Sequence, residues 1–326
     1  MNKNNLKILD CTLRDGGYLI DWDFKKDNIL KIHQCLCNSG IDYIECGFLK
    51  EFGADFNKTF YNTAEELLIL IKQYQKYTVM INFGEYSITN FNDCLNENIK
   101  IRVAFKKEQC KDALNYIRQL KNRGWDVFAN PMSTNTYTRY ELKNLIDEIN
   151  KIEPYGLTIV DTLGNMYENE IADIFKFIDE NTDKNLALCF HSHNNMQLSF
   201  SNAKEILKLD TQREIILDSC LYGMGRGAGN LCTELITKYL NDNFGYKYDI
   251  FNLLENIKNV IMPYYYKKPW GYSIPYYMAA IRGCHPNYAS YLVNLGFDET
   301  KIDELLAKIP EDKKTTYDEI FISSFV

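Results

Sequence analysis

Short apolar segments alternate with longer amphipathic segments from Leu6 to about Phe244. In the amphipathic segments apolar residues recur with the 3.6-residue period of a helix, whereas the short segments have the length of strands. Some short segments, such as Ile215-Ile216-Leu217, are continuously apolar, which is typical of parallel strands covered on both faces. The predicted strands are Lys7–Leu13, Tyr43–Phe48, Thr78–Phe83, Ile101–Phe105, Asp126–Asn130, Gly156–Asp161, Leu186–His191 and Glu214–Leu221, and the clearest helices between them are Asp112–Arg123, Glu141–Ile152 and Asn169–Glu180.

Strands that alternate with helices in this way are parallel and joined by helical crossovers. A doubly wound open sheet and a closed (β/α)8 barrel both have this order of elements. Eight units within about 240 residues match the number of units and the length of a barrel, which takes roughly 250 residues. The predicted fold class is therefore α/β, with a (β/α)8 TIM barrel over residues 1–244 as the first domain.

The pattern changes after Gly245, where helical segments continue without strands. Residues 245–326 are therefore predicted to form a small C-terminal helical domain that packs on the barrel. Its many tyrosines are expected mainly in its core. A lid over the barrel mouth, or a contact surface in a homo-oligomer, is the alternative. The expected helices are Ile250–Met262, Ile274–Gly283, Asn287–Leu295 and Glu299–Lys308.

The net charge of -7 argues against broad binding of nucleic acid, although a few arginines in a cleft can still bind a small anion. The amino terminus lacks the apolar stretch of a secretory signal, and no apolar run reaches the roughly 18 residues of a membrane span. We therefore expect a cytoplasmic protein without membrane contact. The 10 cysteines include no C-x-x-C pair, so reduced thiols are expected rather than disulfides.

Polar residues gather at the carboxyl ends of the predicted strands, where a barrel carries its chemistry. Asn82, Arg102 and Asn130 could equally be the polar residues that any junction between strand and loop contains. The others have stronger chemical character, and they are Arg14, Asp15, Glu45, Asp161, His191 and His193.

His191-Ser192-His193 ends the seventh predicted strand. Side chains two apart on a strand point to the same face, so both imidazoles can converge on one point. A carboxylate such as Asp15 is the natural third ligand, and this donor set suits several divalent metals. Of the other two histidines, His33 is expected on the surface of a charged helix, and the role of His285 is open.

Three segments together resemble a known superfamily. They are D-x-T-L-R-D-G at Asp10–Gly16, H-x-H at His191–His193, and G-x-G-x-G-A-G-N at Gly223–Asn230. Their order and spacing are similar to those of the metal-dependent lyases and aldolases that include 4-hydroxy-2-oxovalerate aldolase, hydroxymethylglutaryl-CoA lyase and isopropylmalate synthase. The likeness is greatest to the 4-hydroxy-2-oxovalerate aldolases. From the glycines alone we expect only a loop that can approach a ligand closely or present amides to an anion.

The resemblance implies that Asp15, His191 and His193 are metal ligands and that Asn230 is a further ligand or a neighbour of one. The implied ion is Mn²⁺, with Mg²⁺, Co²⁺ or Zn²⁺ as alternatives. Arg14 is then the cation that stabilises an enolate. The implied reaction makes or breaks a carbon–carbon bond between a pyruvate enolate and an aldehyde, with a 4-hydroxy-2-oxo acid as the compound that is cleaved.

One position departs from the pattern, because these aldolases carry a histidine base where this chain has Tyr18. An unperturbed tyrosine has a pKa of about 10 and is a poorer base near neutrality. Either Tyr18 is activated, or His285 or a metal-bound hydroxide serves, or the substrate differs. Glu45, Asp161 and Arg226 are expected to bind substrate, although the two carboxylates could equally hold other groups in place.

Two other functions stay open at this point. A Claisen-type acyltransferase that condenses an acyl-CoA with a 2-oxo acid would share the barrel, the metal and the arginine, although no CoA-binding element is evident. A barrel that serves only for binding or assembly is the other alternative, and the retained Arg14, Asp15 and histidines argue against it. An aldehyde dehydrogenase partner is implied by the family alone.

Overall fold

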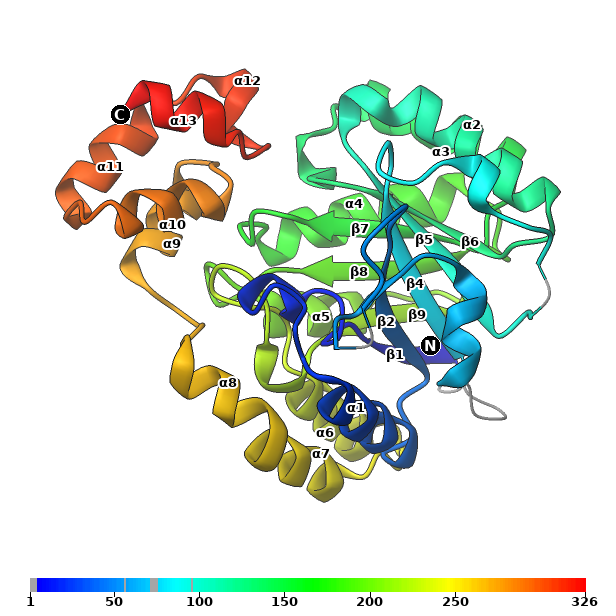
Figure 1. The fold of residues 1–326 in the computed structure, drawn as a ribbon. Coiled ribbons are helices and arrows are strands. Elements are labelled where there is room, and N and C mark those ends of the chain that lie inside the picture. The colour runs from blue at the N-terminus through cyan, green and yellow to red at the C-terminus, as the bar shows by residue number, and fades with distance from the viewer. Residues whose placement is uncertain (1–4, 56, 71–75, 95) are drawn as a thin grey trace.

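The computed structural model describes residues 5–55, 57–70, 76–94 and 96–326 (Figure 1). Its parallel sheet closes on itself, because β1 pairs with β9 on one side and with β2 on the other. All eight predicted strands are present, so the predicted (β/α)8 barrel is confirmed. They are β1 (Leu6–Asp10), β2 (Tyr43–Leu49), β4 (Lys76–Asn82), β5 (Ile99–Phe105), β6 (Val127–Pro131), β7 (Gly156–Asp161), β8 (Ala187–Ser192) and β9 (Ile215–Ser219). The short β3 (Phe60–Tyr61) pairs with the end of β2.

Helices surround the barrel, and the three predicted most clearly are α2, α3 and α4, with ends shifted by at most two residues. Between β2 and β4 the helical element of the described residues is a short 3-10 helix, η3. After β4 it is again a short 3-10 helix, η4, because that segment is rich in asparagine and lacks a helical period of apolar residues. The bounds are α1 (Lys26–Asn38), η3 (Ala64–Ile69), η4 (Ile88–Asn90), α2 (Cys110–Asn122), α3 (Arg139–Ile152), α4 (Glu168–Asn181), α5 (Ser199–Ile206) and α6 (Thr233–Phe244).

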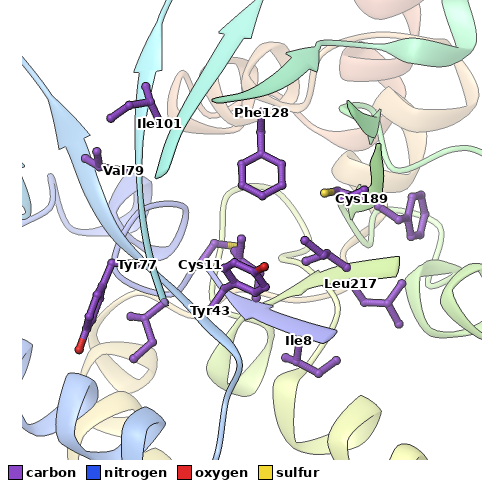
Figure 2. Close-up of a cluster of buried hydrophobic side chains, with 14 of the residues drawn as sticks. Ile8, Cys11, Tyr43, Tyr77, Val79, Ile101, Phe128, Cys189 and Leu217 are labelled. Carbon is purple, nitrogen blue, oxygen red and sulfur yellow. The ribbon is translucent and has the colours of Figure 1, made fainter. Parts of the chain in front are cut away.

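Apolar and aromatic side chains fill the amino-terminal half of the barrel interior. The rings of Tyr43 and Phe128 meet edge to face with centroids 6.4 Å apart, and Cys189 lies near them (Figure 2). The Tyr43 hydroxyl also bonds Tyr155 and Glu214 at 2.8 and 2.9 Å. This end of the barrel is therefore plugged, and a ligand can enter only from the carboxyl ends of the strands.

His33 is buried, with 3% of its surface exposed, so the expectation of a surface position was wrong. It lies on the face of α1 that also carries Ile29 and Leu36, one helical turn to either side, and this face packs on the barrel. Its Nε2 lies 3.1 Å from the Tyr77 hydroxyl. The charged residues around it in sequence occupy the other face of the helix.

The C-terminal segment contributes to two hydrophobic cores. The helices directly after the barrel pack apolar residues such as Leu253 and Ile261 into the barrel core. A second core forms later, around Tyr288 and Leu306. The domain boundary between residues 244 and 245 stays a prediction, because the two cores separate only after Trp270. The helices are α7 (Ile250–Asn256), the π-helical turn η8 (Ile257–Ile261), α8 (Met262–Lys267), α9 (Ile274–Ile281), α10 (Pro286–Asn294), α11 (Glu299–Ala307), α12 (Glu311–Lys314) and α13 (Glu319–Phe325).

The second core belongs to a helical unit, orange to red in Figure 1, that lies beside the carboxyl ends of β7 and β8. Asn165, in the loop after β7, donates a hydrogen bond to the carbonyl of Ala280 in α9 at 3.2 Å. This unit therefore borders the only end of the barrel that remains open. In the part of the chain that the structure describes, no helix combines the length and apolar character needed to cross a membrane, and all ten cysteines are free thiols, as expected.

Candidate metal centre and active site

The loop after β1 places Asp15 over the barrel interior. The strand ends at Asp10, earlier than predicted, because the backbone then folds into a helical turn in which the amides of Arg14 and Asp15 both bond the Cys11 carbonyl, at 3.1 and 2.8 Å. The Asp10 carboxylate fixes this turn by accepting from the Thr12 amide at 2.9 Å. Arg14 and Asp15 therefore follow the strand by one tight turn and are both buried.

The structure brings Asp15, His191 and His193 together. His191 is in β8, and His193 follows it by two residues, held by a 3.2 Å bond from its amide to the Asp161 carbonyl. One carboxylate oxygen and one nitrogen from each imidazole all lie within 4.8 Å of one another. A single ion can therefore touch all three side chains.

Two buried atoms in this group, His193 Nδ1 and Asn230 Oδ1, have no hydrogen-bond partner among the described residues. Asp15 Oδ1 also lacks a hydrogen bond there, and its charged neighbour is Arg14 Nη1 at 3.2 Å. The Asn230 amide nitrogen donates to Asp15 Oδ2 at 2.8 Å, which brings the asparagine next to the carboxylate. Unpartnered buried lone pairs are costly, and a set of oxygen and imidazole donors suits a divalent cation. The residues present therefore fit a divalent metal ion.

Arg14 lies between two carboxylates. Its Nη1 is 3.2 Å from Asp15 Oδ1, and its Nε donates to Glu45 Oε2 at 2.7 Å. Burial disfavours the charged guanidinium, but Glu45 and Asp15 outweigh this and hold the pKa of Arg14 well above its ordinary value. The other oxygen of Glu45 accepts from Arg102 at 3.1 Å. Both oxygens of Glu45 are thus engaged by arginines, so Glu45 orients Arg14.

Asp218, which the sequence analysis missed, completes a ring of charges inside the barrel. Its Oδ2 accepts from Arg102 Nη2 at 2.5 Å and lies 3.1 Å from His191 Nδ1. This contact makes Nδ1 a protonated nitrogen of His191, and Nε2 faces Asp15, 3.4 Å away, as the nitrogen that would bind a metal ion once it is deprotonated. When the side-chain amide of Asn130 is rotated by half a turn, its oxygen also accepts a hydrogen bond from Arg102 Nε at 3.2 Å. A charged residue at an inward position of an apolar strand was the signal that could have revealed Asp218. Arg102 was noted from the sequence only as one of the polar residues at strand ends.

The buried ring carries a net negative charge. Two guanidinium groups face the three carboxylates of Asp15, Glu45 and Asp218, so one cation is needed for balance. A second proton on the His191 ring can supply this positive charge. Burial lowers the pKa of His191, but Asp15 and Asp218 outweigh burial and hold that pKa well above its ordinary value. A metal ion at the same place would replace the proton, which also favours a cation site here.

Tyr18 lies at the barrel mouth in the 3-10 helix η2 (Gly16–Leu19). Its ring packs edge to face on Trp22, with centroids 4.6 Å apart, and the Arg226 guanidinium lies 4.8 Å from the ring centroid. Burial raises the pKa of Tyr18, and the opposing charges of Arg226 and Arg14 only partly offset this. Tyr18 therefore keeps its proton and is not an activated base.

The glycine-rich loop keeps Asn230 in place. A Cβ on Gly225 would lie 2.3 Å from the Asn230 amide nitrogen, and one on Gly229 would lie 2.2 Å from the Gly223 carbonyl. The amides of Gly229 and Asn230 bond Arg226 and Gly223 carbonyls within the loop itself. The glycines thus permit close packing around Asn230, and the loop does not present these amides to an anion as the alternative expectation had it.

Asp161 ends β7, but its carboxylate turns to the following loop. It accepts from the amides of Asn165 and Met166 at 3.1 and 3.2 Å. Burial raises the pKa of Asp161 to about 6, against these hydrogen bonds. Both oxygens are engaged by backbone, so the geometry supports a role in fixing the loop rather than the expected contact with substrate.

A cavity of about 680 Å³ lies at the barrel mouth, beside the carboxyl ends of the strands, and is bordered by the C-terminal helical unit. The ring residues and the proposed metal ligands are not among the residues that line it. Tyr18 and Arg226 line it from the barrel, and His285 and Thr316 line it from the helical unit. His285 is buried, and burial, followed by the charges of Arg226 and His193, holds its pKa well below the ordinary value. The structure thus brings His285 to the same cavity as Tyr18.

The fold and the site define a class of protein: a (β/α)8 barrel with a candidate divalent metal centre of one aspartate and two histidines at its catalytic end. The chain belongs to the HMGL-like family, whose model matches residues 5–255. The resemblance drawn from the three motifs is thereby confirmed. Members of this family include lyases, and the names of the relatives support a lyase activity of the aldolase class.

Two relatives are named 4-hydroxy-2-oxovalerate aldolase. The one from Chloroflexus aggregans is 25% identical over 268 residues, which are 79% of this chain and 76% of the relative. The one from Bacillus thuringiensis is 22% identical over 269 residues, with the same coverage of 79% and 76%.

Solved structures agree on the fold. The N-terminal domain of a proposed aldolase from Bacteroides vulgatus superposes with a TM-score of 0.76 at 29% identity, covering 88% of this chain and 96% of that one. The HMG-CoA lyase from Brucella melitensis has a TM-score of 0.57 at 16% identity, covering 77% and 95%. The second likeness is one of fold alone.

Proposed function

We propose that the protein is a divalent-metal-dependent aldolase that makes or breaks the bond between a pyruvate enolate and an aldehyde, with a 4-hydroxy-2-oxo acid as the compound cleaved. The observation that carries this proposal is the convergence of Asp15, His191 and His193 beside the buried guanidinium of Arg14. The names of the relatives support the same chemistry.

Asp15, His191 and His193 would hold the ion, and Asn230 Oδ1 is the further donor. Two imidazoles with oxygen donors suit Mn²⁺ better than Mg²⁺, and Co²⁺ or Zn²⁺ would also fit. When bound, the ion supplies a Lewis acid for the keto and carboxylate oxygens of the 2-oxo acid. Asp218 keeps the Nε2 lone pair of His191 turned to that point by holding the proton on Nδ1.

Arg14 stabilises the enolate. In condensation carbon three of the enolate attacks the aldehyde carbon, the π pair of the aldehyde becomes a lone pair of the new alkoxide, and the alkoxide takes the hydroxyl proton of Tyr18. Cleavage is the reverse: the C4 hydroxyl returns its proton to the phenolate, the bond between carbons three and four breaks, and the enolate that is left takes up a proton from water at carbon three and becomes pyruvate. A guanidinium held in advance where negative charge develops is among the largest catalytic contributions. Glu45 supports this by fixing Arg14 through Nε.

Tyr18 handles the proton on the aldehyde oxygen. Burial raises its pKa, so its hydroxyl is protonated and can donate to the alkoxide that forms when the carbon–carbon bond is made. An alkoxide is more basic than a phenolate, so this transfer is downhill in the direction of condensation. Arg226, whose buried Nε has no partner among the described residues, is the substrate-binding residue above Tyr18.

The test is exchange of the methyl protons of pyruvate in D₂O, followed by NMR, because enolisation needs no aldehyde. We expect exchange with the Mn²⁺-loaded protein, its loss on chelation, and its return when Mn²⁺ is restored. Absence of exchange with pyruvate and with longer 2-oxo acids, under every metal, contradicts the proposal. Release of free thiol from an acyl-CoA in the presence of a 2-oxo acid would then identify an acyltransferase instead.

A further inference from the structure

The cavity at the barrel mouth is large for the smallest substrate of this kind. Its volume of about 680 Å³ lies within the roughly 300–1,000 Å³ of sites that enclose drug-sized ligands. The substrate in the names of the relatives, 4-hydroxy-2-oxovalerate, has a two-carbon aldehyde portion. That portion would leave most of this space to water. The volume therefore favours a longer aldehyde.

Positive charge dominates the lining of this cavity. Arg226, Lys106 and Lys50 are among the lining residues, and Glu85 is the one carboxylate among those that the structure describes. Lys50 is paired with Glu85. No carboxylate of the described residues pairs with Lys106 or Arg226. Two cations without a counter-ion thus face the space in which an aldehyde would lie, and this indicates an anionic ligand.

His285 lines the same cavity as these two cations and contributes a donor. Burial lowers the pKa of His285, and Arg226, His193 and Lys106 lower it further. Its Nδ1 accepts from the amide of Asn287 at 3.2 Å, as the N-cap of α10. The neutral ring must therefore carry its hydrogen on Nε2, and it has no free lone pair with which to act as a base. His285 is thus a hydrogen-bond donor.

We propose, on the basis of the aldolase function above, that the aldehyde carries an anionic group, a phosphate or a carboxylate, at the end remote from its carbonyl. Arg226, Lys106 and His285 bind this group. The polar residues Thr316 and Asn287 also line the cavity. In condensation only the aldehyde carbon and oxygen react, and the anionic group is unchanged.

The first part of the test uses the wild-type protein loaded with Mn²⁺. Pyruvate exchange in D₂O is measured first, because it tests the proposed aldolase function without any aldehyde. Consumption of pyruvate is then followed with two matched pairs of aldehydes: glyceraldehyde 3-phosphate against glyceraldehyde, and succinic semialdehyde against butanal. We expect kcat/KM for the anionic member to exceed that of its neutral partner by tenfold or more in at least one pair, and the pair identifies the anion.

The second part compares two neighbouring lysines. Lys106→Met is expected to lower the anionic-to-neutral ratio about tenfold, as for loss of one charge-assisted hydrogen bond. Lys106 is exposed, so the substitution leaves the core unchanged. Lys107→Met is the matched control, because Lys107 pairs with Glu141 and bonds the Thr136 carbonyl outside the cavity. We expect it to keep the ratio.

The outcomes separate the two proposals. Absence of exchange removes the aldolase function and this inference with it. Exchange together with equal or poorer use of the anionic aldehyde in both pairs leaves the aldolase function standing and overturns the anionic substrate. A Lys106→Met protein that keeps the wild-type ratio within twofold overturns the assignment of the anion to this cluster.

Discussion

Replacing Arg102 with methionine tests whether the ring of buried charges holds the barrel together. Arg102 is fully buried, and it bonds Glu45 at 3.1 Å and Asp218 at 2.5 Å. Methionine fills a similar volume without charge. The substitution would leave Asp218 with only His191 as a charged partner. Oδ1 of Asp218 already lacks a hydrogen bond among the described residues. The variant therefore buries negative charge without compensation.

The expected cost is large. Removing one partner of a buried ion pair typically costs about 3–5 kcal/mol, because the remaining charge stays desolvated. Native proteins of this kind are stable by only about 5–15 kcal/mol in total. We therefore expect Arg102→Met to lose about a fifth or more of the free energy of unfolding. The loss follows from an unpaired charge, since hydrophobic area and volume change little.

Urea unfolding followed by circular dichroism measures this cost, with chelator present so that bound metal does not add stability. Lys238→Met is the control, because Lys238 pairs with Asp242 on the exposed face of α6 and should cost only about 0.3–0.5 kcal/mol. The double variant Arg102→Met/Asp218→Asn no longer has the unpaired charge of Asp218. The free energy of unfolding that it loses should be smaller, by about 1–3 kcal/mol, than the sum of the losses in the two single variants.

Two results would refute this reasoning. The first is an Arg102→Met protein whose unfolding midpoint lies as close to wild type as that of Lys238→Met. The second is a double variant whose cost equals the sum of the single costs, because additive costs would mean that Arg102 and Asp218 do not interact across the barrel.

Three further predictions concern the metal, the enolate and pH. Mn²⁺ at a hundred times its dissociation constant should raise the free energy of unfolding by about 2.7 kcal/mol over the chelated protein, and an unchanged urea midpoint would contradict the metal site. Arg14→Ala should lower turnover about a hundredfold or more while metal analysis finds the ion still bound, and near-normal turnover would exclude its role. Burial raises the pKa of Asp10 from 3.8 to about 6, so the folded state binds this proton more tightly than the unfolded state. Stability relative to Asp10→Asn should therefore fall by roughly 3 kcal/mol as pH rises from 4 to above 6, and parallel stability curves would contradict this.

The strands and the metal motif could be predicted because their signals are local. A strand covered by helices on one side and by the barrel core on the other is apolar on both faces, as Ile215-Ile216-Leu217 of β9 shows. The two histidines are two residues apart on one strand, so their convergence follows from strand geometry. The end of β1 was misplaced because Leu13 is apolar and buried, but it is buried in a turn.

The ring of charges could not be predicted, because its contacts join residues that are far apart in sequence. Arg102 and Asp218 are separated by 116 positions, and Arg102 and Glu45 by 57. The sequence places each of them near a strand end but does not say which barrel positions face each other. That depends on the stagger between strands, which is a property of the closed sheet. The same limit applies to His285, which reaches the mouth only because the helical unit folds back.

The protonation state of Tyr18 determines which step of the proposed reaction this residue can assist. Burial raises the pKa of Tyr18, and the opposing charges of Arg226 and Arg14 only partly offset this effect, so the hydroxyl stays protonated. A protonated hydroxyl can give its proton to the alkoxide that forms when the carbon–carbon bond is made. Cleavage would need the phenolate as the base and would become faster as the pH rises. A tyrosine at this position thus changes the pH dependence of the proposed reaction without a change in reaction class.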